Sequence, residues 1–220
     1  MPKVLITGAS RGIGLALVKV YQAKGFDVFA SCRRVSTELQ QTGAQIIDNL
    51  DVASGGATSR LREALGGAQL DILINNAGIL SKESLGSIDY GDILKQFEVN
   101  ALAPLRITEA LRDRMVRGAK VALITSRMGS MGDNGSGGYY GYRISKAALN
   151  AAGVSLARDL AESEIAVALL HPGFVQTDMV NHAGDISAEH AAQRLAERID
   201  GLNLENSGSF WHSNGELLPW

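Results

Sequence analysis

Short apolar runs recur along the chain, and each ends at a glycine-rich, polar or irregular stretch. Runs of strand length lie at residues 4–6, 26–31, 45–48, 70–74, 119–126, 165–170 and 208–212. In most of them consecutive residues are apolar, which is typical of parallel strands buried on both faces. The segments between them carry apolar residues at steps of three and four, which predicts helices. We therefore expect an α/β fold with about seven parallel strands, doubly wound, with helices on both faces of the sheet.

Helical patterns lie between the predicted strands. Helices are predicted at residues 15–21, from about Ala53, and over about 89–115, 139–163 and 188–199. Pro104 should bend the helix over 89–115, because proline has no N–H for the helical ladder. The segment from Arg127 to Tyr140 is rich in Gly and Ser, which predicts a loop over the active site.

Composition narrows the class of protein. The 220 residues are 45% hydrophobic and include 25 glycines, which suits one α/β domain over residues 1–220. Acidic and basic residues are interleaved with a formal charge of −2, so there is no basic stripe that would bind nucleic acid. Cys32 is the only cysteine, which excludes an intrachain disulfide and favours a reducing compartment. With no apolar run long enough to span a bilayer and no room for a signal peptide before the first strand, we expect a cytoplasmic protein outside the membrane.

A glycine-rich turn joins the first strand to the first helix. Glycines allow a tight turn and let main-chain N–H groups approach an anion, which the positive end of the helix dipole also attracts. A turn between a strand and a helix is the context that a dinucleotide site of the Rossmann type requires. The alternative is a purely structural turn. The predicted cofactor contacts here are Gly8, Ser10, Arg11, Gly12, Ile13 and Gly14.

The second strand ends at Cys32, which Arg33 and Arg34 follow. In NAD-binding sheets an acidic residue at this place binds the ribose 2′-hydroxyl, whereas arginine suits a 2′-phosphate. Arg11 would add a second positive charge to the same pocket. The two arginines would otherwise only solvate a loop. Their position favours NADP(H) over NAD(H), with Arg33 as a phosphate contact.

Other polar residues follow the predicted strands, at the edge where open α/β sheets bind ligands. Asp51 would accept a hydrogen bond from an adenine amino group or cap the following helix. The amides of the segment 75–78 would contact a ligand or pin neighbouring loops. Ser126 ends the fifth apolar run. Asn100 is a polar residue in an apolar stretch, so its amide needs partners.

Tyr142 and Lys146 lie one turn apart on a predicted helix face. An ammonium beside the phenol would favour phenolate, so that a tyrosine with an ordinary pKa of about 10 becomes a usable acid or base. Such pairs also occur on many solvated helices. The pair indicates a catalytic site only in combination with the glycine-rich turn near the start of the chain.

Together these motifs resemble the short-chain dehydrogenase/reductase family over nearly the whole chain. Thr7–Gly14 is similar to the cofactor turn T-G-x-x-x-G-x-G, and Asn75–Gly78 to the N-N-A-G motif. The resemblance implies a catalytic tetrad of Asn100, Ser126, Tyr142 and Lys146. It implies further cofactor contacts from Asp51, Val52, Asn76, Ala77, Gly78, Tyr142, Lys146, Pro172, Gly173, Val175 and Thr177.

The resemblance also implies a role for each member of the tetrad. Tyr142 would give a proton to a carbonyl oxygen or remove it from an alcohol, and Ser126 would hold that oxygen. Lys146 would lower the pKa of Tyr142 and bind the nicotinamide ribose, while Asn100 would anchor a water that relays protons to Lys146. The expected activity is NADP(H)-dependent reduction of an aldehyde or ketone.

The segment from Ser126 to Tyr142 is a few residues longer than in most members, which makes Ser130 a rival for the serine role. We favour Ser126 because it ends a strand, whereas Ser130 already lies in the loop. The connection 180–187 is short for a lid, so we expect an open, permissive site. Four apolar or aromatic residues would either line the substrate pocket or be ordinary packing residues without a role in binding. They are Met128, Met131, Tyr139 and Phe174.

The sequence around Ser126 and Tyr142 is similar to that in the branch of the family that includes bacterial C-factor-like proteins and carbonyl reductases. A signalling or cofactor-sensing protein with incidental turnover is therefore the alternative function. The family usually pairs its long helices, here about 89–115 and 139–163, so we expect a homodimer or homotetramer. No metal site is predicted.

Overall fold

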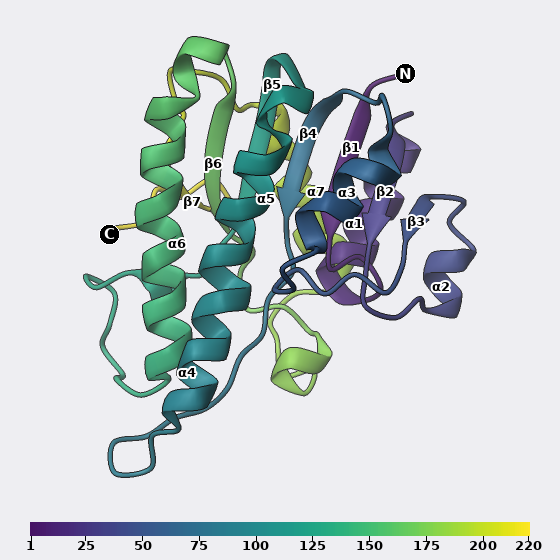
Figure 1. Cartoon of the computed structure of the whole chain (residues 1–220). Helices are drawn as coiled ribbons and strands as arrows, with labels where there is room; N and C mark the ends of the chain where they lie inside the picture. Colours follow the sequence, from purple (N-terminus) through teal and green to yellow (C-terminus); the bar gives the residue numbers. More distant parts are fainter.

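The chain forms one seven-stranded sheet in the computed structural model, which describes all residues from 1 to 220 (Figure 1). All strands pair in parallel, in the order β3-β2-β1-β4-β5-β6-β7. The predicted parallel sheet of the Rossmann type is confirmed. Its strands are β1 Lys3–Thr7, β2 Asp27–Ser31, β3 Gln45–Ile47, β4 Leu70–Asn75, β5 Met115–Ile124, β6 Ala166–His171 and β7 Phe210–His212.

Helices cover both faces of the sheet, as predicted (Figure 1). On one face α1 packs against α7, and on the other α3 packs against α5 and α4 against α6. α2 is a single turn after β2. The bounds are α1 Gly12–Ala23, α2 Thr37–Gln40, α3 Ala57–Leu65, α4 Tyr90–Phe97, α5 Ala103–Leu111, α6 Tyr140–Asp159 and α7 Ala188–Asp200.

The strand β1 shows why the apolar runs are continuous. Val4 and Ile6 belong to the core on the α1 and α7 side, whereas Leu5 belongs to the core on the other side. Successive side chains of a strand point to opposite faces, so a strand covered on both faces needs apolar residues at every position. All three are fully buried.

The chain from 89 to 115 is not the single helix predicted there. A π-helical turn, Glu98–Leu102, separates α4 from α5, and Met115 already begins β5. Pro104 lies in the first turn of α5, where a missing N–H is tolerated. Because Pro104 has no N–H, the Asn100 carbonyl cannot accept the usual bond from the residue four positions on. This explains why the regular helix gives way to a wider turn at Asn100.

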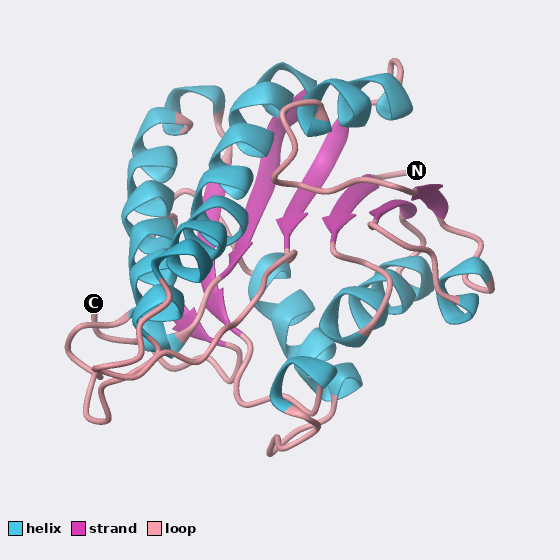
Figure 2. Cartoon of the chain, turned by 60° about the horizontal axis from the view of Figure 1, so that its bottom comes forward, coloured by secondary structure: helices cyan, strands magenta, loops and turns pink.

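The carboxyl ends of the strands lie along one edge of the sheet, where the loops that follow them gather (Figure 2). The strand order reverses between β1 and β4, and crevices at such switch points bind ligands in open α/β sheets. The fold therefore brings the predicted segments after β1, β2, β4, β5 and β6 to one edge. No helix has the length and apolar character needed to cross a bilayer.

Candidate active site

A cavity of about 1010 Å³ lies at the carboxyl ends of the strands, across the switch point. Its volume is at the upper end of the range of about 300–1,000 Å³ that is usual for small-molecule sites, which suits an extended ligand. Of the predicted cofactor contacts, only Gly173 and Val175 do not line it. Those that do are Gly8, Ser10, Arg11, Gly12, Ile13, Gly14, Arg33, Asp51, Val52, Asn76, Ala77, Gly78, Tyr142, Lys146, Pro172 and Thr177.

The glycine-rich turn after β1 packs too closely for larger residues. Gly8 and Gly12 have φ of +67° and +52°, which L residues rarely adopt. A Cβ on Gly14 would lie 2.2 Å from the Gly8 carbonyl oxygen. No side chain caps the first turn of α1, where Arg11 is the N-cap residue. The N–H groups at the start of α1 are therefore left for an anion in the cavity.

Asn76 pins this turn to β4. Its Nδ2 donates to the carbonyl oxygens of Thr7 and Gly8, at 3.0 and 3.2 Å. The Thr7 hydroxyl in turn accepts the N–H groups of Asn76 and Ala77, at 3.0 and 3.1 Å. Of the two roles that the sequence left open for these amides, the structure shows the pinning of a neighbouring loop.

Positive charge borders the cavity beyond β2. Arg33 and Arg34 line it, and neither forms an ion pair within the protein. Arg11 also lines it but is paired with Asp178 at 2.5 Å, and the other Asp178 oxygen lies 3.1 Å from His182. The charge of Arg11 is thus directed to the segment after β6, which leaves Arg33 and Arg34 as the unpaired cations at this end.

The predicted helix start near Ala53 is wrong, because α3 begins at Ala57. The Asp51 carboxylate accepts the Ala53 N–H at 3.0 Å within a turn that precedes the helix. The capping role is therefore wrong as well. Asp51 and Val52 both line the cavity.

Tyr142 and Lys146 lie one turn apart on α6, with only 9% and 4% of their surfaces exposed. Lys146 Nζ lies 5.7 Å from the centre of the Tyr142 ring and donates to the Ile124 carbonyl at 2.8 Å. Burial lowers the pKa of Lys146 to about 8. Burial also raises the pKa of Tyr142 to about 12, although the Ser126 hydroxyl acts in the opposite direction.

The expectation that Lys146 lowers the pKa of Tyr142 is therefore not what the structure shows. The cost of burying a phenolate is the larger effect, and the buried amine itself resists charging. Proximity along a helix could be predicted from the sequence, whereas the degree of burial could not.

The structure brings one of the two candidate serines to Tyr142. The Ser126 hydroxyl interacts with the phenol and accepts the Met128 N–H at 3.1 Å. Ser130 instead donates to the main-chain oxygen of Trp220 at 3.1 Å and accepts the Asp133 N–H at 3.0 Å. The preference for Ser126 thus agrees with the geometry.

Asn100 is fully buried and links the segment after β4 to α6. Its side chain accepts the Ile79 N–H at 2.8 Å, and it donates to the Ile79 carbonyl at 2.8 Å and the Ser145 hydroxyl at 3.0 Å. A Cβ on Gly78 would lie 3.3 Å from Asn100 Oδ1 and 3.8 Å from Lys146 Nζ, so these three residues meet. The partners that this buried amide needed are therefore all present.

Glu83, which no sequence motif pointed to, is buried with 3% of its surface exposed. Its carboxyl group accepts the Gly141 N–H at 3.1 Å and Gln96 Nε2 at 2.6 Å, so it serves the first turn of α6. The N-cap residue of α6, Tyr139, is left-handed with φ of +52° and makes no capping bond. The lack of a capping side chain at this position was the one signal that a partner from elsewhere was needed.

Other residues of the cavity were missed as well. Lys95, Glu98 and Val99 line it and lie within the five residues before Asn100. None of the four proposed wall residues lines it. Met131 and Phe174 are 74% and 48% exposed, so ordinary packing does not describe them either.

The segment after β6 lines one side of the cavity. Its contributors are Gln176, Thr177, Asp178, Met179 and His182. Of the connection 180–187, which was expected to leave the site open, only His182 lines the cavity. No group of three or more His, Cys, Asp or Glu is placed to hold a metal ion.

The arrangement has a definite chemical capacity. A phenol, an amine and a hydroxyl meet beside β5, whereas unpaired arginines lie beside β2, which β1 and β4 separate from β5. Such a site can bind a phosphorylated ligand along the edge of the sheet and move a proton to or from an oxygen atom at its other end.

Comparison with known proteins agrees with this geometry. A family model described as short chain dehydrogenase matches residues 2–187. The chain is 41% identical over 226 residues to a 1-hydroxy-2-glutathionyl-2-methyl-3-butene dehydrogenase of Rhodococcus sp. (strain AD45), and all of both chains is covered. It is 46% identical over 154 residues to the C-signal of Myxococcus xanthus, which covers 69% of this chain and 93% of that protein.

The fold is also similar to solved structures. A carbonyl reductase from Pseudomonas aeruginosa PAO1, crystallised in complex with NADP, matches with a TM-score of 0.84 and 34% identity. The match covers 100% of both chains. The similarity therefore extends beyond the glycine-rich turn to the whole arrangement of sheet and helices.

Proposed function

The chain belongs to the short-chain dehydrogenase family, and from that premise we propose that it is an NADP(H)-dependent oxidoreductase that interconverts a carbonyl group and an alcohol. The observation that carries the proposal is the meeting of Tyr142, Lys146 and Ser126 beside a cavity of dinucleotide size. The names of the relatives support both directions, because one is a dehydrogenase and another a carbonyl reductase.

The residues of the cavity fit this cofactor. The uncapped start of α1 suits its pyrophosphate, and the close packing at Gly8 and Gly14 keeps that approach clear. Arg33, unpaired at the end of β2, suits a 2′-phosphate. NADP(H), when bound, supplies or accepts the hydride.

Proton transfer is assigned to Tyr142 and Lys146. The Tyr142 hydroxyl would protonate the carbonyl oxygen in reduction, while the Ser126 hydroxyl holds the same oxygen by a hydrogen bond. The pKa of Lys146, about 8, lies close to neutral pH, so its amine can both release and regain a proton. Lys146 can therefore restore the proton that Tyr142 gives up.

Asn100 would support this relay through its main chain. Both ends of its side chain are occupied by Ile79 and Ser145. A relaying water would therefore bind the Asn100 carbonyl, which Pro104 deprives of its usual helical donor. The side chain itself positions α6, because Ser145 donates to the Tyr142 carbonyl at 2.8 Å.

The test is a screen of aldehydes and ketones with NADPH, and of alcohols with NADP⁺, followed by cofactor absorbance. In Tyr142→Phe we expect kcat to fall by about 10²–10⁴-fold with NADPH affinity retained, because only the transferable proton is removed. A Tyr142→Phe variant that reduces a carbonyl substrate at the rate of the unchanged protein would refute the mechanism.

A second candidate function follows from the similarity to the C-signal. The chain would then be a signalling or cofactor-sensing protein whose turnover is incidental. Tight NADPH binding without turnover of any compound in the screen would favour this candidate.

We further propose a cytoplasmic homo-oligomer. Cys32, the only cysteine, is a buried thiol, as a reducing compartment allows. Tyr90 and Leu94 on α4 are 72% and 69% exposed, and such apolar groups are covered when long helices pair. Light scattering after size exclusion measures the assembly, and a mass of one chain at micromolar concentration would contradict pairing.

A further inference from the structure

The serine beside Tyr142 lies directly after the last residue that the sheet holds, because the Thr125 N–H still donates to the Leu170 carbonyl of β6 at 2.9 Å. β5 ends at Ile124, and a 3-10 turn, Arg127–Gly129, follows Ser126. The turn packs tightly against α6, because a Cβ on Gly129 would lie 2.7 Å from the main chain of Lys146. The position of Ser126 therefore depends on Thr125 before it and on what holds the residues that follow it.

Met128, whose N–H donates to the Ser126 hydroxyl at 3.1 Å, is itself held from α6. Arg143, next to Tyr142 on α6, donates from Nη1 to the Met128 carbonyl at 3.4 Å. Arg143 also donates to the Ser136 hydroxyl at 2.9 Å and the Gly138 carbonyl at 3.2 Å. The loop after Ser126 is thus tied on one side to the helix that carries Tyr142.

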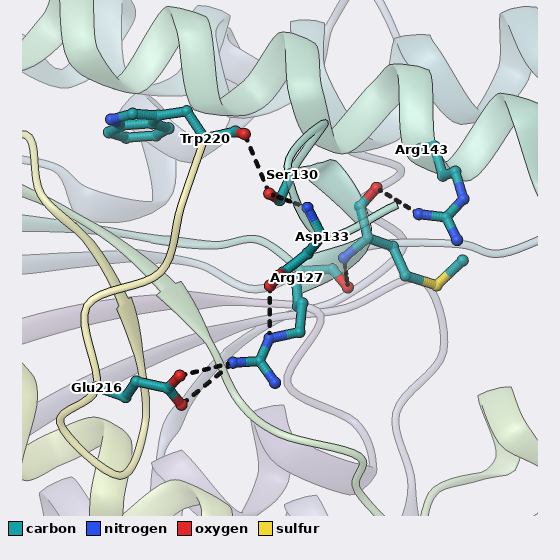
Figure 3. A network of polar contacts seen from close by, with 8 residues as sticks. Arg127, Ser130, Asp133, Arg143, Glu216 and Trp220 are labelled. Atoms are coloured by element: carbon teal, nitrogen blue, oxygen red, sulfur yellow. Dashed lines mark hydrogen bonds and ion pairs between the residues drawn. The ribbon is translucent and has the colours of Figure 1, made fainter. Parts of the chain in front are cut away.

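On the other side the loop is tied to residues 213–220, which we call the strap (Figure 3). Arg127 Nη2 donates to both carboxylate oxygens of Glu216 at 3.1 Å. Its Nε lies 3.0 Å from Asp133 Oδ2, an ion pair whose N–H is not aimed at the oxygen. The main-chain oxygen of Trp220 accepts from the Ser130 hydroxyl at 3.1 Å and the Gly132 N–H at 2.9 Å.

The strap is itself anchored to the last strand of the sheet. Gly215, with φ of +98°, turns the chain back along β7. The His212 N–H donates to the Glu216 carbonyl, and the Leu218 N–H to the Phe210 carbonyl, both at 2.8 Å. The Trp220 ring stacks on Phe210 with 5.4 Å between centres. A rigid edge of the sheet thus places Glu216 and the Trp220 oxygen against the loop.

We propose that the strap positions Ser126 for proton transfer, with Arg127 and Glu216 as positioning residues. The inference rests on the proposed function of Ser126. Arg127 and Glu216 are 41% and 53% exposed in their side chains, so their ion pair contributes little to global stability. Its effect is on geometry, and a displacement of about 1 Å in an active site can lower a rate by about 100-fold.

The experiment compares Glu216→Gln, Arg127→Ala and Arg127→Lys in the full-length protein, with para-nitrobenzaldehyde and NADPH as the probe reaction. Glu164→Gln is the matched control, because Glu164 pairs with Arg117 in an exposed ion pair near the opposite end of β5. The measurements are kcat, KM, the NADPH dissociation constant by fluorescence, and the midpoint of thermal unfolding. All three variants leave the tetrad and the cavity lining unchanged.

We expect kcat to fall about 10-fold in Arg127→Ala and about 3-fold in Glu216→Gln. Arg127→Lys should lie between Arg127→Ala and the unchanged protein, since lysine keeps the charge but not the two-sided contact. NADPH affinity and the unfolding midpoint should stay within error, and the control should match the unchanged protein. A general loss of structure would instead lower affinity and the midpoint together with kcat.

An unchanged kcat in Glu216→Gln and Arg127→Ala would overturn the inference. If Arg127→Ala does not fold, Glu216→Gln and Arg127→Lys decide alone. Failure of this inference is distinct from failure of the proposed function, because in the first case Tyr142→Phe still abolishes turnover.

Discussion

Around the glycine-rich turn the cavity is bounded mainly by main-chain groups, whereas around Tyr142 it is bounded by buried side chains. The turn follows a regular strand and precedes a regular helix, and it is fixed by three hydrogen bonds that Asn76 donates and one that Ala77 donates. Near Tyr142 the segments are irregular, with a π-helical turn at Asn100, a 3-10 turn after Ser126 and a left-handed Tyr139. The turn is therefore mostly main chain in a regular setting, pinned from β4 by Asn76 and Ala77, whereas the surroundings of Tyr142 depend on tertiary contacts that bury polar side chains at a cost in stability.

The largest effect is expected on NADPH affinity, at the glycine-rich turn. In Gly14→Ala the added methyl would lie 2.2 Å from the Gly8 carbonyl oxygen and 2.7 Å from Asn76 Nδ2, so the turn must shift. We expect NADPH binding to weaken by about 100-fold, as for other displacements of about 1 Å in a preformed site. Gly55→Ala is the matched control, because a Cβ there meets nothing within 4 Å. Equal NADPH affinity in Gly14→Ala and Gly55→Ala, measured by titration, would show that the close packing of the turn does not control cofactor binding.

The next largest effect is expected beside Tyr142, as an increase in the free energy of unfolding when Lys146 is replaced. Burial lowers the pKa of Lys146 from 10.5 to about 8. Keeping this lysine charged at pH 7 thus costs the folded state about 3 kcal/mol. In Lys146→Met this cost is removed, but the hydrogen bond to the Ile124 carbonyl is lost. We expect the variant to be inactive yet more stable, by about 2 kcal/mol at pH 7.

The pH dependence of this gain has a definite sign. Between pH 8 and 10.5 the unfolded chain binds a proton at Lys146 that the folded chain has lost, so the stability of the unchanged protein rises with pH in this window. The advantage of Lys146→Met should therefore be full below pH 8 and vanish by about pH 10.5. Urea unfolding at several pH values measures it. An advantage that grows with pH would show that Lys146 is stabilising when charged.

A smaller effect is expected from charge at the cofactor end. In Arg33→Ala the affinity for NADPH should fall about 10-fold, while that for NADH stays unchanged, because only NADPH carries the phosphate. Arg117→Ala, at an exposed ion pair of β5, is the control for net charge. Equal losses for both cofactors would assign Arg33 to general charge rather than to phosphate recognition.

The smallest effect concerns the strain before α6. Tyr139 has φ of +52°, which costs about 1 kcal/mol in a residue other than glycine. Tyr139→Gly should be more stable than Tyr139→Ala by about that amount, because both lose the ring but only glycine relieves the strain. Chemical denaturation compares them directly. A more stable alanine variant would mean that the left-handed conformation is not retained in solution.

Local sequence patterns predicted the part of the cavity around the glycine-rich turn well. The apolar strands, the glycine-rich turn and Arg33 depend on neighbours in the sequence, and the structure places them at the same cavity. The surroundings of Tyr142 were predicted only in part. Tyr142 and Lys146 were placed on one helix correctly, but the direction of the Tyr142 pKa shift depends on burial, which only the packed fold determines.

Other errors have the same physical origin. The helix over 89–115 was predicted from its apolar period. A π-helical turn before Pro104 divides it, and Met115 at its end already belongs to β5. Glu83 escaped notice because its partner Gly141 is 58 residues away. The assignment of the tetrad by resemblance stays a prediction, and the Tyr142→Phe measurement decides it.

The carboxyl group of Glu83 also bears on the order in which the protein folds. The first turn of α6 has no capping side chain of its own, so its N–H groups gain a buried acceptor only when the segment around Glu83 and Gln96 docks. Until then that turn should fray, and Tyr142 with it. We therefore expect amide hydrogens near Tyr142 to gain protection from exchange late in refolding, after those of the sheet.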